Sequence, residues 1–309
     1  MRVILARPRG FCAGVERAIL CVEEALDRYG PPVYVLNDIV HNAHVVNDLK
    51  DKGAVFVKDL SEVPPGSNLL FSAHGVSPAR YAEADQFNLE VIDATCPLVE
   101  KVHNEARRFT KKGHTVILIG EPGHDETVGT LGWAEGNIHR VLTLEEVEAL
   151  DFPEGTPLSY ITQTTLSVDD CQRVIDALTA KFPHIQGPPS DDICYATTNR
   201  QQAVKQLTPE ADLVLVVGDV TSANSNRLVE IAMELGKPAF LVPDASGINE
   251  VWLRDAKSVL VTAGASAPEH LVTGVVDFFR KRGETEVIER DLIKESVYFK
   301  LPKELAATS

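Results

Sequence analysis

The sequence predicts an α/β protein made of three similar modules, each with a small parallel sheet. Apolar runs typical of strands alternate with helical periodicity along the 309-residue chain, a pattern typical of parallel sheets. Cysteines also stand in three non-periodic turns, at Cys12, Cys96 and Cys194, and the same order of elements follows each of them. Like modules pack about an axis, so we expect a pseudo-threefold arrangement that brings the three cysteines together.

The first module is expected over residues 13–95. After Cys12 come a helix and a strand that ends in a polar corner with His41. After a further helix and strand, another strand leads through His74 into a helix, and a last strand precedes Cys96. The segments that carry these elements are, in chain order, 15–30, 33–40, 68–84 and 90–94.

The second module is expected over residues 96–192 and repeats this order. Its first strand ends in a corner that holds His124 and Glu126. A later strand enters the hydroxyl-rich turn "TQTTLS", with Thr164 and Thr165, before a further helix. The segments are 98–113, 115–120 and 158–182.

The third module is expected over residues 193–282. Its two corners are "TSANSN", with Ser222 and Asn224, and "AGASAP", with Ser266. The predicted segments are 197–207, 212–218 and 258–279. A final strand is missing, and the N-terminal segment 1–12, with a strand over 2–6, is expected to complete the sheet. Residues 283–309 are expected to form a C-terminal tail.

Composition and charge exclude several classes of protein. No window approaches the roughly 20 apolar residues of a membrane span, and the N-terminus lacks the apolar stretch of a signal peptide. We therefore expect a cytoplasmic protein without a membrane partner. The net charge of −15 disfavours a nucleic-acid partner, because phosphate neutralisation needs clustered Lys and Arg. The five cysteines include no CxxC pair, which argues against a disulfide framework or a zinc ribbon.

The three turn cysteines suggest a metal site with an open position. Cys21 and Cys171 lie within helical patterns, and Cys171 is expected to be a small buried hydrophobic residue. Three convergent thiolates are one short of the four that close a structural zinc site or an ordinary iron–sulfur site. A vacant position leaves room for a substrate.

The polar corners offer neutral groups for an anion. In parallel sheets ligands bind beyond the carboxyl ends of strands, where helix N-termini present N–H groups. Helix capping is the alternative interpretation of the Ser and Thr residues. Glu126 is the candidate proton donor if burial raises its pKa, and otherwise a first-turn glutamate favoured by the helix dipole.

Seven motifs resemble those of one family, the 4-hydroxy-3-methylbut-2-enyl diphosphate reductases, also called LytB or IspH. They are "PRGFCAGVERA", "FSAHGVS", "DATCPLV", "TQTTLS", "DDICYATTNRQ", "NSNRL" and "TAGASAPE". The resemblance implies a 4Fe-4S cluster held by Cys12, Cys96 and Cys194, with one iron free of protein ligands. It implies reduction of an allylic alcohol diphosphate to isopentenyl or dimethylallyl diphosphate, the last step of the non-mevalonate pathway.

The resemblance also assigns roles to the corner residues. Glu126 would supply protons, with Thr164 and Thr165 relaying them. Ferredoxin or flavodoxin would donate electrons, since the chain has no flavin or nicotinamide motif. The residues implied to hold the diphosphate are His41, His74, His124, Ser222, Asn224 and Ser266.

The chain departs from the family pattern at three places. Ala223 replaces the second of two serines, which removes a hydroxyl donor worth roughly 1.5–3 kcal/mol in a bond to a charged group. The segments "EPGHDETVGTLG" and "VLNDIVHN" also differ from the usual runs. The implied cluster ligands and proton relay are intact, so an active enzyme is expected, with a diverged paralogue as the alternative.

Other functions predict different features. A three-cysteine hydro-lyase would bind carboxylates through Arg clamps, and the corners are poor in Arg. A cluster-based redox or iron sensor would need a partner surface or a basic patch, and an electron carrier would need a fourth ligand. A diverged paralogue could also act on another allylic diphosphate.

Overall fold

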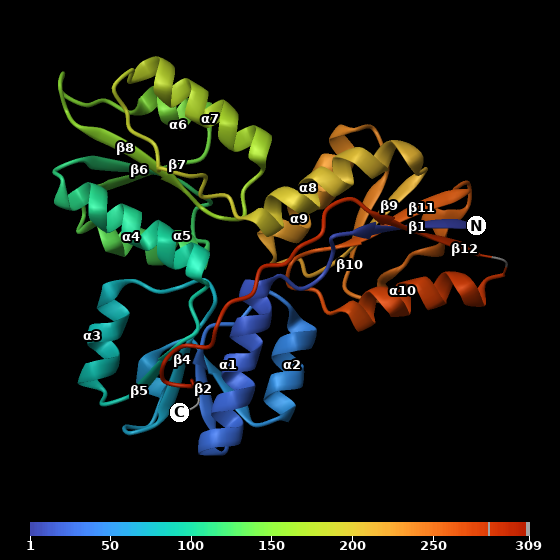
Figure 1. Ribbon diagram of the computed structural model, residues 1–309, viewed down its shortest axis with the longest axis horizontal. Coiled ribbons are helices and arrows are strands. Elements are labelled where there is room, and N and C mark those ends of the chain that lie inside the picture. The colour runs from blue at the N-terminus through green and yellow to red at the C-terminus, as the bar shows by residue number, and fades with distance from the viewer. Residues whose placement is uncertain (284, 307–309) are drawn as a thin grey trace. The chain divides into compact units, whose positions relative to one another are not determined.

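The computed structural model describes residues 1–283 and 285–306 of the chain (Figure 1). Within these residues it contains three separate sheets, and every strand pair in them is parallel. The predicted α/β class with three small parallel sheets is confirmed. No helix in the described residues is long and apolar enough to cross a membrane, and the cytoplasmic location stays a prediction.

The first sheet has the strand order β3-β2-β4-β5. Its register pairs Val35 of β2 with Leu70 of β4, and Leu70 with Ile92 of β5. The two central strands, β2 and β4, are largely apolar and buried, as expected for a parallel sheet with covered faces. The elements are α1 (Ala13–Tyr29), β2 (Val33–Leu36), α2 (Ala43–Asp51), β3 (Ala54–Val57), the 3₁₀ turn η1 (Leu60–Glu62), β4 (Asn68–Phe71), α3 (Pro78–Gln86) and β5 (Glu90–Asp93).

The second sheet has the order β7-β6-β8. A fourth strand is reduced to a single parallel bridge between Ser159 of β8 and Gln186. The elements are α4 (Pro97–Lys111), β6 (Thr115–Ile119), α5 (Asp125–Leu131), η2 (Gly132–Ala134), β7 (Ile138–Val141), α6 (Leu144–Ala149), β8 (Leu158–Thr162) and α7 (Val168–Lys181).

The third sheet has the order β10-β9-β11-β1-β12. Val3 of β1 pairs with Val259 of β11, so the prediction that the N-terminal strand completes this sheet is confirmed. The elements are β1 (Arg2–Arg7), α8 (Tyr195–Leu207), η3 (Thr208–Glu210), β9 (Leu213–Val217), α9 (Ala223–Glu234), β10 (Ala239–Val242), η4 (Ala245–Gly247), η5 (Glu250–Leu253), β11 (Ser258–Ala263), α10 (Glu269–Lys281) and β12 (Glu286–Asp291).

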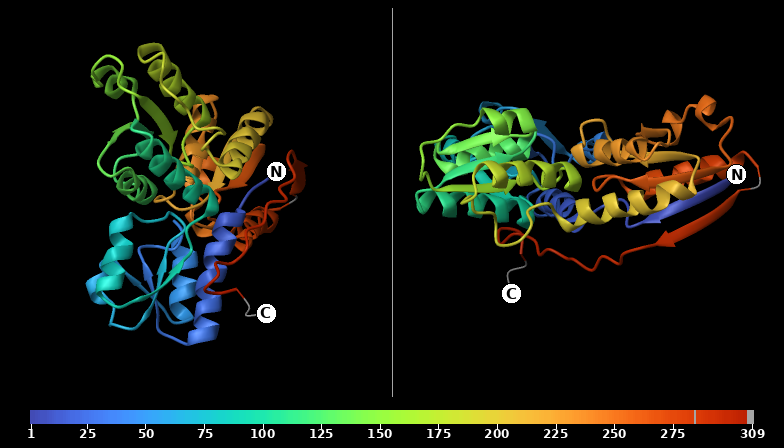
Figure 2. Two further views of the ribbon diagram at one scale, coloured as in Figure 1. Left: turned by 60° about the vertical axis from the view of Figure 1, so that its left-hand side comes forward. Right: turned by 90° about the horizontal axis from the view of Figure 1, so that it is seen from above.

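Strand β12 corrects the expectation that residues 283–309 form only a tail. It runs parallel to the outer side of β1, with Val287 opposite Val3 (Figure 2). Four of its six residues are charged and most are exposed, so an edge strand here carries little hydrophobic signal. Residues 284 and 307–309 of the predicted tail lie outside the described residues.

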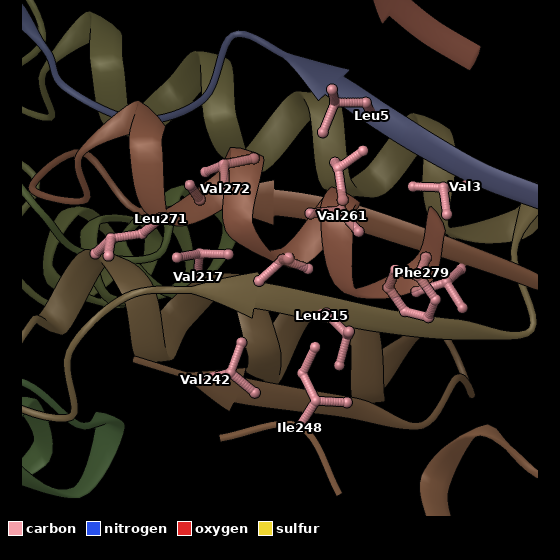
Figure 3. Packing of buried hydrophobic residues seen from close by; sticks show 14 of the residues in the cluster. Val3, Leu5, Leu215, Val217, Val242, Ile248, Val261, Leu271, Val272 and Phe279 are labelled. Carbon is pink, nitrogen blue, oxygen red and sulfur yellow. The ribbon is translucent and has the colours of Figure 1, made fainter. Parts of the chain in front are cut away.

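The third sheet is buried on both faces by alternating residues. On one face Leu215, Val217 and Val261 pack with Val272 and Phe279 of α10 (Figure 3). The other face belongs to a second core cluster, which includes residues of α8 and α9. Because successive strand residues point to opposite faces, the run "LVLVV" of β9 supplies both clusters. Packing on both faces gives the loops at the strand ends a rigid base.

The chain divides into two compact units. The first comprises residues 1–15, 41–45 and 195–298 and contains the third sheet. The second comprises residues 16–40, 46–194 and 299–309 and contains the first and second sheets. Each predicted module therefore has a sheet of its own, while the predicted domain boundaries stay a prediction.

Candidate functional site

The three turn cysteines occupy equivalent places in the three sheets. Each follows the fourth strand in the order of its sheet and directly precedes a helix. Cys12 lies between β1 and α1, and Cys96 lies between β5 and α4. Cys194 lies between the Gln186 bridge and α8. The backbone N–H of each cysteine donates to a carbonyl just beyond the third strand of that sheet. The acceptors are Ala265 for Cys12 at 3.1 Å, Ala73 for Cys96 at 3.0 Å and Thr164 for Cys194 at 3.0 Å. The repeat inferred from the pattern of elements is thus present in the backbone bonds.

The cysteines fall into two classes by environment. Cys12, Cys96 and Cys194 are half-buried, and each stands at a helix N-terminus. Cys21 and Cys171 are buried, which raises the pKa of their thiols to about 11 and about 12. A thiol that keeps its proton is a poor metal ligand. The expectation that Cys171 is a buried hydrophobic residue is confirmed.

Glu126 lies in the first turn of α5 and is only 2% exposed. Its Oε1 accepts the backbone N–H of Thr164 at 2.6 Å, and its Oε2 accepts the Thr164 hydroxyl at 2.9 Å. Burial raises the pKa of Glu126 to about 7, although the two bonds from Thr164 favour the carboxylate. A carboxyl group with this pKa is still partly protonated at neutral pH, which is the condition set above for a proton donor.

Two histidine rings lie together at the N-terminus of α5. His124 caps α5, and its Nδ1 accepts the backbone N–H of Glu126 at 3.1 Å. In neutral His124 this bond places the ring proton on Nε2, where it can be donated to a ligand. The ring of His74 lies edge-on to that of His124, with centroids 5.9 Å apart, and its Nδ1 is 3.3 Å from the Ser72 hydroxyl.

Gln163 organises this corner and was missed by sequence reasoning. Its Oε1 accepts the backbone N–H of Glu121 at 2.8 Å and the Thr127 hydroxyl at 3.1 Å. Its Nε2 donates to the Thr165 hydroxyl at 2.9 Å. Gln163 is 1% exposed, and one buried amide therefore connects the loop before α5, the first turn of α5 and the turn after β8. The only signal was a glutamine inside a hydroxyl-rich turn.

A second corner lies at the ends of β9 and β11. Ser222 caps α9, and its Oγ accepts the backbone N–H of Ser225 at 3.3 Å and the Ser225 hydroxyl at 3.0 Å. Both bonds use the oxygen as acceptor, so the Ser222 hydroxyl can still donate to a ligand. The Ser266 hydroxyl donates to the backbone carbonyl of His41 at 2.8 Å. Capping and ligand binding are compatible here.

Asn224 provides the clearest sign of a ligand in this corner. It lies in the first turn of α9 and is 4% exposed. Neither its Nδ2 nor its Oδ1 has a hydrogen-bond partner in the part of the chain that the structure describes. Leaving a buried amide unsatisfied costs about 1–3 kcal/mol for each group. An added Cβ at Gly264 would collide with Ser225, so glycine lets this turn pack closely on the strand ends.

The structure places the predicted residues in two groups, one in each unit. The first unit holds Cys12, His41, Ser222, Asn224 and Ser266. The second unit holds His74, Cys96, His124, Glu126, Thr164, Thr165 and Cys194. Fold and side chains together define a parallel α/β protein with half-buried thiols, imidazole, hydroxyl and amide groups and a buried glutamate of raised pKa near its strand ends.

Comparison with known proteins identifies the family. A model of the LytB protein family matches residues 3–280, and the chain belongs to that family. A 4-hydroxy-3-methylbut-2-enyl diphosphate reductase of Zymomonas mobilis subsp. mobilis is 54% identical over 305 residues, 99% of this chain and 90% of that protein. The 4-hydroxy-3-methylbut-2-enyl diphosphate reductase 2 of Bradyrhizobium diazoefficiens is 54% identical over 308 residues, 100% of both chains.

Solved structures agree with this assignment. The E-1-hydroxy-2-methyl-but-2-enyl-4-diphosphate reductase of Plasmodium falciparum superposes with a TM-score of 0.95 at 40% identity, covering 98% of this chain and 96% of that one. A (E)-4-hydroxy-3-methyl-but-2-enyl diphosphate reductase, described as the terminal enzyme of the non-mevalonate pathway, superposes with a TM-score of 0.65 at 33% identity. That match covers 91% of this chain and 99% of the other.

Proposed function

We propose that the chain reduces 4-hydroxy-3-methylbut-2-enyl diphosphate to isopentenyl and dimethylallyl diphosphate, the last step of the non-mevalonate pathway. The allylic C–O bond breaks, two electrons and two protons are taken up, and the oxygen leaves as water. The names of the relatives support this substrate. The observation that carries the proposal is the buried Glu126–Thr164 pair, because this reaction needs a proton donor that is still protonated near pH 7.

The family resemblance implies an iron–sulfur enzyme, and we propose a single 4Fe-4S cluster held by Cys12, Cys96 and Cys194. The three cysteines fit this role, since they are half-buried at helix N-termini and follow the same position in each sheet. When bound, such a cluster supplies single electrons and one iron without a protein ligand. A ferredoxin or flavodoxin is the proposed electron donor.

The diphosphate is held mainly by neutral groups in this proposal. Asn224 offers a buried amide without a partner among the described residues, and Ser222 offers a hydroxyl proton at the N-terminus of α9. His124 offers its Nε2 proton beside the N-terminus of α5. Helix N-termini favour phosphate without any lysine, which accounts for anion binding by a chain with a net charge of −15. His41, His74 and Ser266 complete the proposed set.

Glu126 and Thr164 would move the proton. In the structure the Thr164 hydroxyl donates to Oε2 at 2.9 Å, and protonation of Oε2 would reverse this bond. Protonated Glu126 would then donate to the Thr164 oxygen, while Thr164 donates its own hydroxyl proton to the substrate oxygen. The 2.6 Å bond from the Thr164 backbone N–H stabilises the carboxylate that remains. Burial keeps bulk water away from the pair. Thr165, whose hydroxyl is engaged by Gln163, would assist as a second hydroxyl near the substrate.

Substitutions at Thr164 test this relay. Thr164→Val keeps the shape and the backbone bond to Glu126 but removes the hydroxyl, and we expect product formation to fall about 10²-fold. Thr164→Ser keeps the hydroxyl and should retain activity within about tenfold of the wild type. Anaerobic assays on preparations with equal iron content measure the difference. Equal losses in the two variants would contradict a hydroxyl relay and indicate a packing role.

Substitutions in the α9 turn test the diphosphate corner. Asn224→Ala should weaken binding of inorganic diphosphate about tenfold or more, because a hydrogen bond to a charged group is lost. Ala223→Ser, which adds a hydroxyl at the first position of the same helix, should tighten binding. Titration calorimetry on the two variants and the wild type gives the affinities. Unchanged affinity in Asn224→Ala would place the anion elsewhere.

A further inference from the structure

The backbone around Cys12 is held on several sides within the first unit. The carbonyl of Gly10 accepts two bonds from the Arg200 guanidinium, from Nε at 3.2 Å and from Nη2 at 2.7 Å. The backbone N–H of Cys12 donates to Ala265, and that of Ala13 donates to the Tyr195 hydroxyl at 3.2 Å. Arg200 and Tyr195 both belong to α8, the helix that directly follows Cys194.

Arg200 is the key residue of this arrangement, because its side chain is fully buried. Its Nη1 also donates to the carbonyl of Ala196 at 3.0 Å. A buried guanidinium is stable only if a counter-ion and hydrogen-bond acceptors surround it. The counter-ion is Glu295, whose Oε1 lies 3.1 Å from Nη1 and also accepts the Asn199 amide at 3.0 Å.

Glu295 comes from the segment after β12, which the sequence reading treated as a plain tail. Glu295 supplies the negative charge that pairs with the buried Arg200 side chain, and its own side chain is 18% exposed. The segment therefore reaches the Cys12 turn through one specific ion pair. Loss of Glu295 would leave Arg200 buried without its counter-ion, and the bonds to Gly10 would weaken as Arg200 moved toward water.

We propose that Arg200 and Glu295 are positioning residues for Cys12, so that the C-terminal segment is part of the metal-binding apparatus of this protein. Glu295 orients Arg200, and Arg200 holds the carbonyls of residues 10 and 11. The thiol is thereby presented in one orientation before any metal binds. This inference rests on the proposed role of Cys12 as a cluster ligand.

The reactivity of individual cysteines in the full-length, metal-free chain tests the inference. We expect Glu295→Gln to raise the alkylation rate of Cys12 by iodoacetamide about fivefold or more, because the turn opens locally. The rates of Cys96 and Cys194 should stay within about twofold, and they serve as internal controls. Glu295→Asp should restore part of the protection. Arg290→Gln, which removes the exposed β12 ion pair with Glu210, should have no effect.

Mass spectrometry of the labelled peptides gives the three rates in one experiment. A uniform rise at all three cysteines would overturn the proposal, since it indicates general loosening, and so would an unchanged Cys12 rate. Because no cluster is needed for this readout, it stands apart from the test of the proposed function. In the reconstituted chain, Glu295→Gln should also release iron to a chelator several-fold faster than Arg290→Gln. Equal release rates would likewise count against the proposal.

Discussion

Replacing Glu126 with glutamine is expected to lower the rate of product formation by about 10²- to 10⁴-fold. Glutamine fits the same space, with its Oε1 accepting the Thr164 backbone N–H and its Nε2 donating to the Thr164 hydroxyl. The change therefore removes the transferable proton without disturbing the corner. Anaerobic turnover at matched iron content measures the loss, and activity within tenfold of the wild type would exclude Glu126 as the proton donor.

The same substitution is expected to stabilise the folded protein at alkaline pH. The carboxyl group of Glu126 has an ordinary pKa of 4.5, and burial raises it to about 7 in the fold. Between these values the folded state binds more protons than the unfolded state, so stability falls as the pH rises from about 4.5 to 7. Above pH 7 the buried carboxylate costs about 3 kcal/mol, which glutamine does not incur.

Urea denaturation of the metal-free proteins at pH 5 and pH 8 measures this difference. Glu126→Gln should gain stability over the wild type at pH 8 and little at pH 5. The control is Glu145→Gln, which changes an exposed glutamate in the first turn of α6. Hydrogen bonds from its own backbone N–H and from the Thr143 side chain lower the pKa of Glu145. That variant should gain nothing at pH 8. A Glu126→Gln protein less stable than the wild type at pH 8 would contradict the assigned burial cost.

Replacing any one of Cys12, Cys96 and Cys194 with serine is expected to abolish stable cluster binding. With two thiolates left, a 4Fe-4S cluster would have only half of the four protein ligands that it usually has. Iron content and visible absorbance after anaerobic reconstitution should fall close to background, and turnover with them.

The buried cysteines provide the matched controls. Cys21→Ala and Cys171→Ala remove thiols that burial keeps protonated, so both variants should reconstitute like the wild type. Their cost should appear only in the free energy of unfolding, at about 1 kcal/mol for a small buried side chain. Loss of the cluster in Cys171→Ala, or its retention in Cys96→Ser, would refute the assignment of ligands.

Much of the fold followed from periodicity. The alternation of strands and helices is a property of whole segments, and it predicted the three sheets and the return of the N-terminal strand beside β11. The edge strand β12 was not predicted, because its residues are mainly charged and exposed. Its backbone pairs with β1, and backbone pairing leaves no mark in composition.

The candidate site residues could be proposed from their residue types. The residues that hold the backbone around them could not. Cysteines in turns and a glutamate at a strand-end corner are informative on their own. Gln163, Arg200 and Glu295 are single polar residues whose importance depends on burial and on partners far away in the chain. The unsatisfied amide of Asn224 is likewise a property of the packed structure. Such groups become visible only when the fold defines what surrounds them.

The central claim is that this chain carries out reductive dehydroxylation of an allylic diphosphate. The most direct measurement incubates the anaerobically reconstituted protein, with its iron content verified, with dithionite, a viologen and 4-hydroxy-3-methylbut-2-enyl diphosphate. We expect isopentenyl and dimethylallyl diphosphate as products, with their formation largely lost in Glu126→Gln. Binding of the substrate by an iron-replete wild type without any formation of five-carbon diphosphate products would contradict the claim.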